Sequence, residues 1–289
     1  SISVCTAPLT TRTTLEFGDF PRDAATIDGR AISGHEMDRV LAVVDPVRAR
    51  VGLDRRFRMM SINDFPSNVG LGASASGFAA LALAATQAAG LSLNLEEVSR
   101  IARRGAGSAS RSVTGAFSKW KMGLADEDSY AVQLAGDDLQ MDMIVALIPA
   151  FKQTEDAHRE ALTSPFFHAR LAEMPRLIAE MELAIRKRDG GAICALAERD
   201  TLMLHGITMT GAAEMVLWQP ETLRVILAVR KMRDAGMPAF FSIDTGATVY
   251  VNTLAGRGPE VQARIEELGI RTIPCTVGGP ARIVDESLF

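Results

Sequence analysis

Cysteine and histidine are scarce in this sequence, and neither forms a cluster. The three cysteines stand far apart at Cys5, Cys194 and Cys275, and the four histidines are equally dispersed. Their odd number and wide spacing indicate no disulfide framework, and no group of these residues has zinc-ligand spacing. This pattern is typical of the reducing cytosol, so we expect a cytoplasmic protein without a zinc site.

Long apolar runs and strong charge are lacking as well. The formal net charge is −4 over 289 residues, which is too weak to indicate a nucleic-acid-binding surface. No apolar run is long enough to span a membrane, and no signal peptide is evident. We therefore expect neither nucleic acid nor a membrane as a partner. The chain begins with Ser1 instead of Met, from which we expect that upstream residues are missing.

The composition and the order of the elements favour an α+β protein with two domains. Apolar residues make up 47% of the chain, which supports a substantial core, and 289 residues suffice for two ordinary domains. Strand and helix patterns alternate up to residue 148, and after Pro149 the composition turns helical before strands return. We predict domains at residues 1–148 and 149–289, with a last short strand at 281–284.

Three local patterns make sharper predictions. An Asp-Gly pair between apolar residues predicts a hairpin at 26–32. Apolar spacing predicts a helix from His35 to Val51, which Pro46 is expected to bend or end. Asn94 and Glu97 have the spacing of a capping box at the start of the next helix.

A glycine-rich loop is the most informative stretch of the chain. It runs from Asp64 to Gly77, between a strand-like run and a long helix of small residues. Strand, glycine loop and helix start together form an anion site, because the first free N–H groups of the helix point at the anion. Ser74 and Ser76 add hydroxyl donors. The loop matches neither a Walker motif nor a dinucleotide fingerprint, and a helix start that merely packs tightly is the alternative.

Two further places carry chemistry. A second glycine-serine turn, at 105–115, again offers backbone donors, and Arg111 adds a planar fork for a carboxylate or phosphate. The alternative for Arg111 is a surface ion pair. Asp244 ends an apolar strand and precedes a glycine turn, where a carboxylate either caps the turn or is a buried acid aimed into a cleft. The local sequence favours the cap.

Together these segments resemble a known family. The segment from Pro66 to Ser74 resembles the phosphate loop of the GHMP kinase superfamily, Pro-x-x-x-Gly-Leu-(Gly/Ala)-Ser-Ser, with Ala73 in place of the first serine. The second turn, the Asp-Thr-Gly at 244–246, and the Asp-Thr at 200–201 with His205 resemble motifs of the mevalonate-pathway decarboxylases of that superfamily. The likeness is greatest to the archaeal type that acts on mevalonate 5-phosphate. It implies the GHMP kinase fold, with an N-terminal ribosomal-S5-domain-2-like domain and a C-terminal ferredoxin-like domain.

The resemblance implies an activity and a set of roles. ATP would phosphorylate the C3 hydroxyl of mevalonate 5-phosphate with the help of Mg2+, and loss of phosphate and CO2 would leave isopentenyl phosphate. Asp244 would be the catalytic base or orienting group and Arg111 the cation beside the departing carboxylate. Substrate would bind Ser108, Ser110, Arg111 and Thr154. ATP phosphates would bind Asn68, Gly70, Leu71, Gly72, Ala73, Ser74 and Ala75, with Mg2+ at Ser74. The family also implies a homodimer.

The sequence departs from the diphosphate enzymes of this family in ways that bear on the substrate. Ala106 replaces a serine of the second turn, and acidic residues at 155–156 stand where the family has a Ser-Ser-Thr segment. Two acids would repel a diphosphate, so both changes favour a monophosphate. The family's first strand, with a substrate-binding lysine, is not in the sequence. The alternatives are the diphosphate reaction, a mevalonate 3-kinase without decarboxylation, against which Asp244 argues, and a non-catalytic ATP-binding scaffold.

Overall fold

The computed structural model describes residues 1–67, 70–150 and 154–289, with side-chain detail beginning at residue 156 in the last range. Its residues form two compact units. Unit 1 contains Ser1–Pro66, Gly72–Asp137 and Gly278–Phe289, and unit 2 contains Ser67–Leu71 and Asp138–Val277. Each unit is therefore assembled from segments that are distant in the sequence. Within the described ranges, no helix has the length and apolar character needed to cross a membrane.

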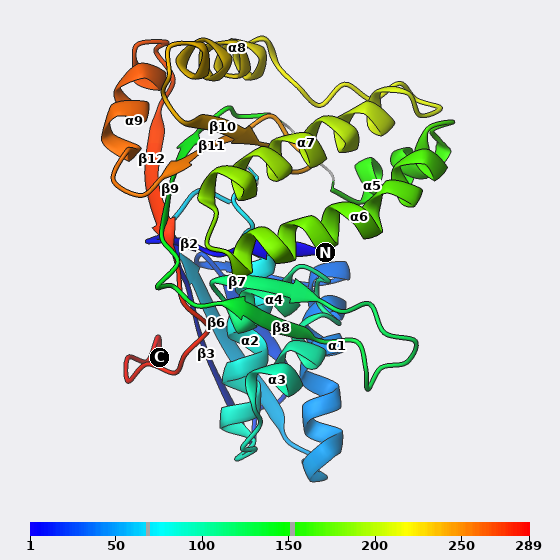
Figure 1. Cartoon of the computed structure of the whole chain (residues 1–289). Coiled ribbons are helices and arrows are strands. Elements are labelled where there is room, and N and C mark those ends of the chain that lie inside the picture. The colour runs from blue at the N-terminus through cyan, green and yellow to red at the C-terminus, as the bar shows by residue number, and fades with distance from the viewer. Residues whose placement is uncertain (68–69, 151–153) are drawn as a thin grey trace. The chain divides into compact units, whose positions relative to one another are not determined.

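Unit 1 consists of two sheets and the helices that pack on them (Figure 1). One sheet has the strand order β1-β7-β8 and the other β3-β6-β4-β5, in which only β4 and β6 are parallel. The strands are β1 (Ile2–Val4), β2 (Thr6–Ala7), β3 (Thr11–Gly18), β4 (Ala24–Ile27), β5 (Arg30–Ala31), β6 (Arg56–Asn63), β7 (Phe117–Trp120) and β8 (Ala131–Ala135). The helices are α1 (His35–Val51), α2 (Ala73–Ala88), α3 (Leu95–Ala102) and α4 (Ala109–Thr114).

The core of unit 1 follows from the apolar faces of these elements. Val43, Val44 and Val47 of α1 are fully buried, and they belong to one cluster with Leu81 of α2 and Phe57 of β6. Small residues of α2 allow it to lie close to β3, α3 and α4. Burying such side chains contributes about 1.5–3 kcal/mol each. Helix α2 thus contributes to the centre of the core of unit 1.

The local predictions in unit 1 are confirmed with one difference. Asp28 and Gly29 both have positive φ, at 50° and 78°, and they join β4 to β5 in the expected hairpin. The capping box is complete, because Glu97 N–H donates to Asn94 Oδ1 at 2.9 Å and Asn94 N–H donates back to Glu97 Oε2 at 3.1 Å. Pro46 does not end α1, which continues unbroken to Val51.

The end of the chain differs from the prediction. No strand forms at 281–284, and residues 278–289 instead run as an irregular segment against unit 1. Ala116 N–H donates to Gly278 O at 2.8 Å, Gly278 N–H to Cys5 O at 2.9 Å, and Ala281 N–H to Val113 O at 3.0 Å. These backbone groups thus have hydrogen-bond partners in loops and at a helix end, so the segment does not need to pair with a strand of a sheet.

Unit 2 is an antiparallel sheet with helices (Figure 1). Its strands lie in the order β10-β11-β9-β12. The strands are β9 (Met141–Ala146), β10 (Ala239–Ser242), β11 (Val249–Leu254) and β12 (Thr272–Val277). The helices are α5 (Thr154–Thr163), α6 (Phe167–Arg186), α7 (Gly190–Met209), α8 (Pro220–Asp234) and α9 (Gly258–Glu266).

The sheet of unit 2 buries one face under α8 and α9. Val225 and Val229 of α8 and Val261 of α9 share a cluster with Phe241 of β10 and Val251 of β11, all at 0% exposure. The sequence-based division at residue 148 placed β9 in the first domain. In the structure, β9 pairs with β11 on one side and with β12 on the other, and it therefore belongs to unit 2.

Gly115→Ala should destabilise unit 1 strongly. Gly115 has φ 64° and ψ −175°, a conformation that only glycine adopts readily, and a Cβ there would collide with the backbone of Gly279 and Pro280. We expect a loss of roughly 3 kcal/mol or more in the free energy of unfolding, measured by urea denaturation. Gly90→Ala is the matched control. Its φ is +70° but a Cβ would meet nothing within 4 Å, so only about 1–2 kcal/mol should be lost. Equal losses would contradict the role given to the Gly279–Pro280 contact.

Candidate functional site

The first turn of α2 keeps the features of an anion site. Gly70 and Gly72 have φ values of 85° and 77°, which side-chain-bearing residues rarely adopt. A Cβ on either would come no closer than 3.7 Å to another atom, so conformation and not tight packing explains these glycines. The first turn has no acidic residue and no side-chain cap. The positive end of the helix is therefore left for an outside anion.

The two serines of this turn have different surroundings. Ser74 is exposed, and its hydroxyl has no hydrogen-bond partner among the described residues. The Ser76 hydroxyl lies 2.7 Å from the Thr11 hydroxyl of β3 and 3.3 Å from Gly72 O. Only Ser74 thus fits the expected donor role, and Ser76 joins α2 to the neighbouring strand. This corrects the prediction that both serines serve the site.

The other predicted members of the loop lie as follows. Leu71 is buried, whereas Ala73 and Ala75 are half-buried at the start of α2. Leu71, Ala73 and Ala75 have no polar side-chain atoms, so only their main-chain atoms could bind phosphate, as their predicted role requires. Asn68 lies outside the described residues. Thr154 begins α5 in unit 2, and its side chain is outside the description.

Close packing against aromatic rings explains why the second turn has glycine at positions 105 and 107. A Cβ on Gly105 would collide with the Phe78 ring, and one on Gly107 would lie 2.9 Å from Trp120. The main-chain donors that follow are also engaged, since the N–H groups of residues 109, 110 and 111 donate to carbonyls three residues back. The backbone anion cradle expected here is therefore not formed by these donors.

The predicted substrate-binding serines of this turn also differ. Ser110 is fully buried, and its hydroxyl donates to Gly107 O at 2.7 Å, which closes the turn. Ser108 is exposed at the N-cap of α4, and its hydroxyl has no partner among the described residues. Of the two, Ser108 has the hydroxyl that a ligand could reach.

Arg111 is held by the first strand. Its Nε donates to the Ser3 hydroxyl at 2.8 Å and its Nη1 donates to the Ser1 hydroxyl at 2.7 Å. Two neutral hydroxyls thus orient the guanidinium. Burial raises the pKa of the nearby Cys5 thiol to about 11, and the positive charge of Arg111 offsets part of this rise. The Cys5 thiol is therefore neutral near pH 7. Sequence reasoning missed these serine partners because they lie more than 100 residues away.

Asp244 follows β10 in unit 2. The residue is exposed, and among the described residues no donor bonds its carboxylate. The turn cap that the local sequence favoured is therefore not formed by any described N–H group. The neighbours Thr245 and Thr248 are buried, so the main chain of this turn is packed while the carboxylate remains accessible. Such a group can accept a proton or a hydrogen bond from a ligand.

One face of α7 fixes the main chain that leads to Asp244. Thr201 Oγ1 accepts from the N–H of Ile243 at 3.0 Å, and His205 Nε2 lies 2.9 Å from the carbonyl O of Asp244. Glu198 adds a third contact, accepting from Phe241 N–H at 3.2 Å. Residues 198, 201 and 205 are spaced three and four apart, which places them on one side of a helix. The resemblance pointed to Thr201 and His205, whereas Glu198 was missed although this spacing includes it.

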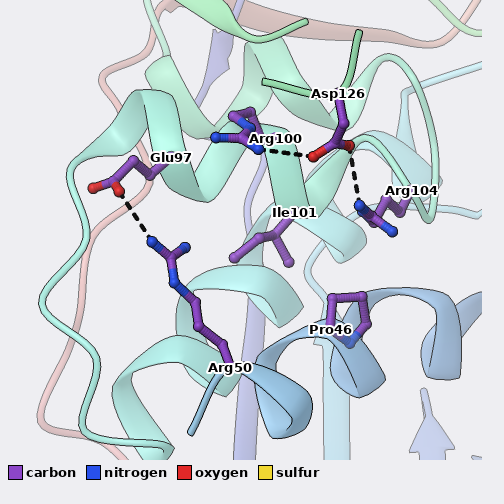
Figure 2. Close-up of a pocket in the computed structure, with 7 residues that line it drawn as sticks. All are labelled: Pro46, Arg50, Glu97, Arg100, Ile101, Arg104 and Asp126. Carbon is purple, nitrogen blue, oxygen red and sulfur yellow. Dashed lines mark hydrogen bonds and ion pairs between the residues drawn. The ribbon is translucent and has the colours of Figure 1, made fainter. Parts of the chain in front are cut away.

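A pocket in unit 1 contains none of the predicted site residues. Figure 2 shows Asp126 between Arg100 and Arg104, whose guanidiniums lie 2.8 and 3.0 Å from its carboxylate. Arg103 also pairs with Asp126, and the cavity beside them has a volume of about 100 Å³. These arginines lower the pKa of Asp126. The pocket is therefore a paired ionic network. Over the described ranges, no group of three or more His, Cys, Asp or Glu residues could hold a metal ion.

Comparison with known proteins identifies the family. Residues 1–131 match the family model described as the diphosphomevalonate decarboxylase-like N-terminal domain. A phosphomevalonate decarboxylase from Haloferax volcanii is 47% identical over 291 aligned residues, which cover 99% of this chain and 90% of that protein. This chain belongs to the mevalonate-pathway decarboxylases. The expectation of a decarboxylase from this branch of the GHMP kinase superfamily is thus confirmed.

Solved structures of mevalonate-pathway decarboxylases confirm the expected GHMP kinase fold. The mevalonate diphosphate decarboxylase from Staphylococcus aureus has a TM-score of 0.90 and 29% identity, covering 97% of this chain and 87% of that one. A structure described as MDDEF in complex with MVAPP, AMPPCP and magnesium has a TM-score of 0.89 and 28% identity, covering 96% and 88%. The roles of single residues stay predictions. Unit 1 contains Ser74 and Arg111, and unit 2 contains Asp244.

Thr201→Val should destabilise unit 2, while Thr201→Ser should not. Thr201 is 4% exposed, and valine has the same shape without the oxygen that accepts from Ile243 N–H. A buried N–H without an acceptor costs about 1–3 kcal/mol. Urea denaturation should show this loss for the valine variant, and hydrogen exchange should show faster exchange at the end of β10. A serine variant as unstable as the valine variant would contradict the assigned hydrogen bond.

Asp126→Asn should weaken unit 1 in a pH-dependent manner. The arginines hold the folded-state pKa of Asp126 below the ordinary 3.8, so its stabilising charge is present above that pH and is lost as pH falls through the lower folded value. Near pH 7 we expect a loss of about 1 kcal/mol, because the carboxylate is partly exposed. The difference from wild type should shrink below about pH 4 in denaturation experiments. Glu127→Gln, an exposed neighbour, is the control, and a pH-independent loss for Asp126→Asn would refute this account.

Proposed function

We propose that this protein catalyses the ATP-dependent decarboxylation of mevalonate 5-phosphate to isopentenyl phosphate, ADP, phosphate and CO2. The observation that carries the proposal is the 47% identity to a phosphomevalonate decarboxylase over 99% of the chain. Asp244 supports it, because its exposed carboxylate stands where the family has its aspartate. The same residue argues against a kinase that stops at the phosphorylated intermediate.

In this proposal Asp244 and Arg111 have the roles that the family resemblance implies. Asp244 accepts the proton of the C3 hydroxyl while the hydroxyl oxygen bonds to the γ-phosphorus of ATP and ADP leaves. The C3–O bond then breaks with loss of phosphate, and the electron pair of the C1–C2 bond forms the double bond as CO2 leaves. Arg111 holds the departing carboxylate in place, for which its planar fork is suited. Ser108 offers the substrate an additional hydroxyl donor.

The start of α2 fits the phosphates of ATP. Its positive φ glycines, its uncapped first turn and the exposed Ser74 hydroxyl are the features that a phosphate tail requires. Magnesium bound to nucleotide phosphates commonly keeps water and takes few protein ligands, so a single serine hydroxyl is an adequate contribution. When bound, the ion would neutralise charge on the phosphates. The similar structure with AMPPCP and magnesium supports this assignment.

The sequence favours a monophosphate as substrate. Ala106 stands where the diphosphate enzymes of the family have a serine, so one hydroxyl donor is absent. The acidic pair at 155–156 lies at the start of α5, although Asp156 is partly neutralised by Arg159 at 2.5 Å. Homodimer formation and a cytoplasmic location remain further predictions of the family resemblance and of the cysteine pattern.

Product identification tests the reaction. The purified protein should release CO2 and isopentenyl phosphate from mevalonate 5-phosphate with ATP and Mg2+, measured by mass spectrometry and by phosphate release. If the protein prefers mevalonate 5-diphosphate as its substrate, the proposed reaction would be replaced by the diphosphate reaction. A stable 3-phosphate without CO2 would indicate the kinase.

Asp244→Asn should abolish most of the turnover. The amide cannot accept the hydroxyl proton, and we expect a rate loss on the order of 10³-fold, or about 4 kcal/mol in barrier height. Phosphate release under saturating ATP is the measurement. Asp54→Asn, at an exposed aspartate without a described partner, is the control and should retain full activity. An unchanged rate for Asp244→Asn would exclude Asp244 as the base.

A further inference from the structure

The strand that follows Asp244 carries a tyrosine whose hydroxyl reaches the glycine loop. Tyr250 lies in β11, and its hydroxyl donates to the carbonyl O of Gly70 at 3.0 Å, across 180 residues of sequence. This is its only hydrogen bond to a described residue. Both residues belong to unit 2. A half-buried tyrosine hydroxyl requires a partner, and here the partner is the main chain of the loop proposed to bind nucleotide.

The environment keeps this hydroxyl protonated. Burial raises the pKa of Tyr250 well above its ordinary value, and the negative charge of Asp244 raises it further. The hydroxyl therefore remains protonated, and a donor, near neutral pH.

The backbone around this hydrogen bond is tightly constrained. Gly70 has φ 85°, and Thr248 Cβ, in the turn that joins β10 to β11, is the nearest atom that an added Cβ would meet, at 3.7 Å. The Thr248 hydroxyl in turn lies 3.3 Å from both the N and the O of Ile148. Leu71, next to Gly70, is buried. Gly70 therefore lies beside β11 and the turn that precedes it.

We propose that Tyr250 is a positioning residue that holds Gly70 of the phosphate loop in its nucleotide-binding conformation. Its hydroxyl donates to the Gly70 carbonyl and so fixes the glycine loop to the strand that begins five residues after Asp244. The proposal rests on the proposed function in assigning nucleotide to this loop.

The test compares Tyr250→Phe with Tyr130→Phe. The sequence has only these two tyrosines, and Tyr130 has a hydrogen bond of its own, from Lys121 Nζ at 3.1 Å. Tyr250→Phe should raise KM for ATP about tenfold and change kcat less than threefold, because the loop loses its fixed conformation but no reacting group is removed. Tyr130→Phe should change neither constant. An unchanged KM for ATP in Tyr250→Phe, with the protein folded, would overturn the proposal.

Binding of AMPPCP with Mg2+, measured by calorimetry, separates this proposal from the proposed reaction. If wild type binds AMPPCP and Tyr250→Phe binds it about tenfold more weakly, the positioning role stands even when no decarboxylation is found. Equal affinities overturn it even when decarboxylation is confirmed.

A second measurement serves if Tyr250→Phe does not fold. In the Tyr130→Phe background, 3-fluorotyrosine labels position 250 alone. Its fluorine resonance should shift on addition of AMPPCP and Mg2+. The absence of a shift at saturating AMPPCP would overturn the proposal.

Discussion

The hydrogen bonds between α7 and the end of β10 are the contacts on which the candidate site depends. Thr201 and His205 bind the main chain of residues 243 and 244, so the position of the Asp244 carboxylate follows from the packing of one helix against one strand. Glu198 extends this face, because it also receives two hydrogen bonds from Arg233 of α8, at 2.8 and 3.0 Å. An exposed acid is thereby carried on a main chain whose own polar groups are buried and satisfied.

Sequence reasoning succeeded where the determining interactions are local. The Asp28-Gly29 turn and the Asn94 capping box each depend on residues within four positions of one another. Helix α1 continues through Pro46 to Val51 because the cost of an interior proline, about 3 kcal/mol, is opposed by the burial of valines on both sides of it. Sequence reasoning failed at 281–284, where a short, mostly apolar run predicts an extended chain but cannot show whether a neighbouring strand is free to pair with it.

The same difference between local and distant interactions applies to the candidate site. Ser74 and Ser76 are two residues apart on a helix, roughly 200° around its axis, so helix geometry alone could have separated the exposed serine from the packed one. The glycines at 105 and 107 could not have been interpreted this way. Their aromatic neighbours Phe78 and Trp120 come from α2 and β7, and no local pattern indicates them. The family resemblance supplied the chemistry, whereas the tertiary contacts determine which residues can perform it.

The return of residues 278–289 to unit 1 has a consequence for how the chain matures during synthesis. Val113, Gly115 and Ala116 acquire their final neighbours only from this last segment. A ribosome therefore releases the whole of unit 2 before unit 1 can complete its packing. Translation from the N-terminus normally allows early segments to fold first, but here the earliest unit is the last to be finished.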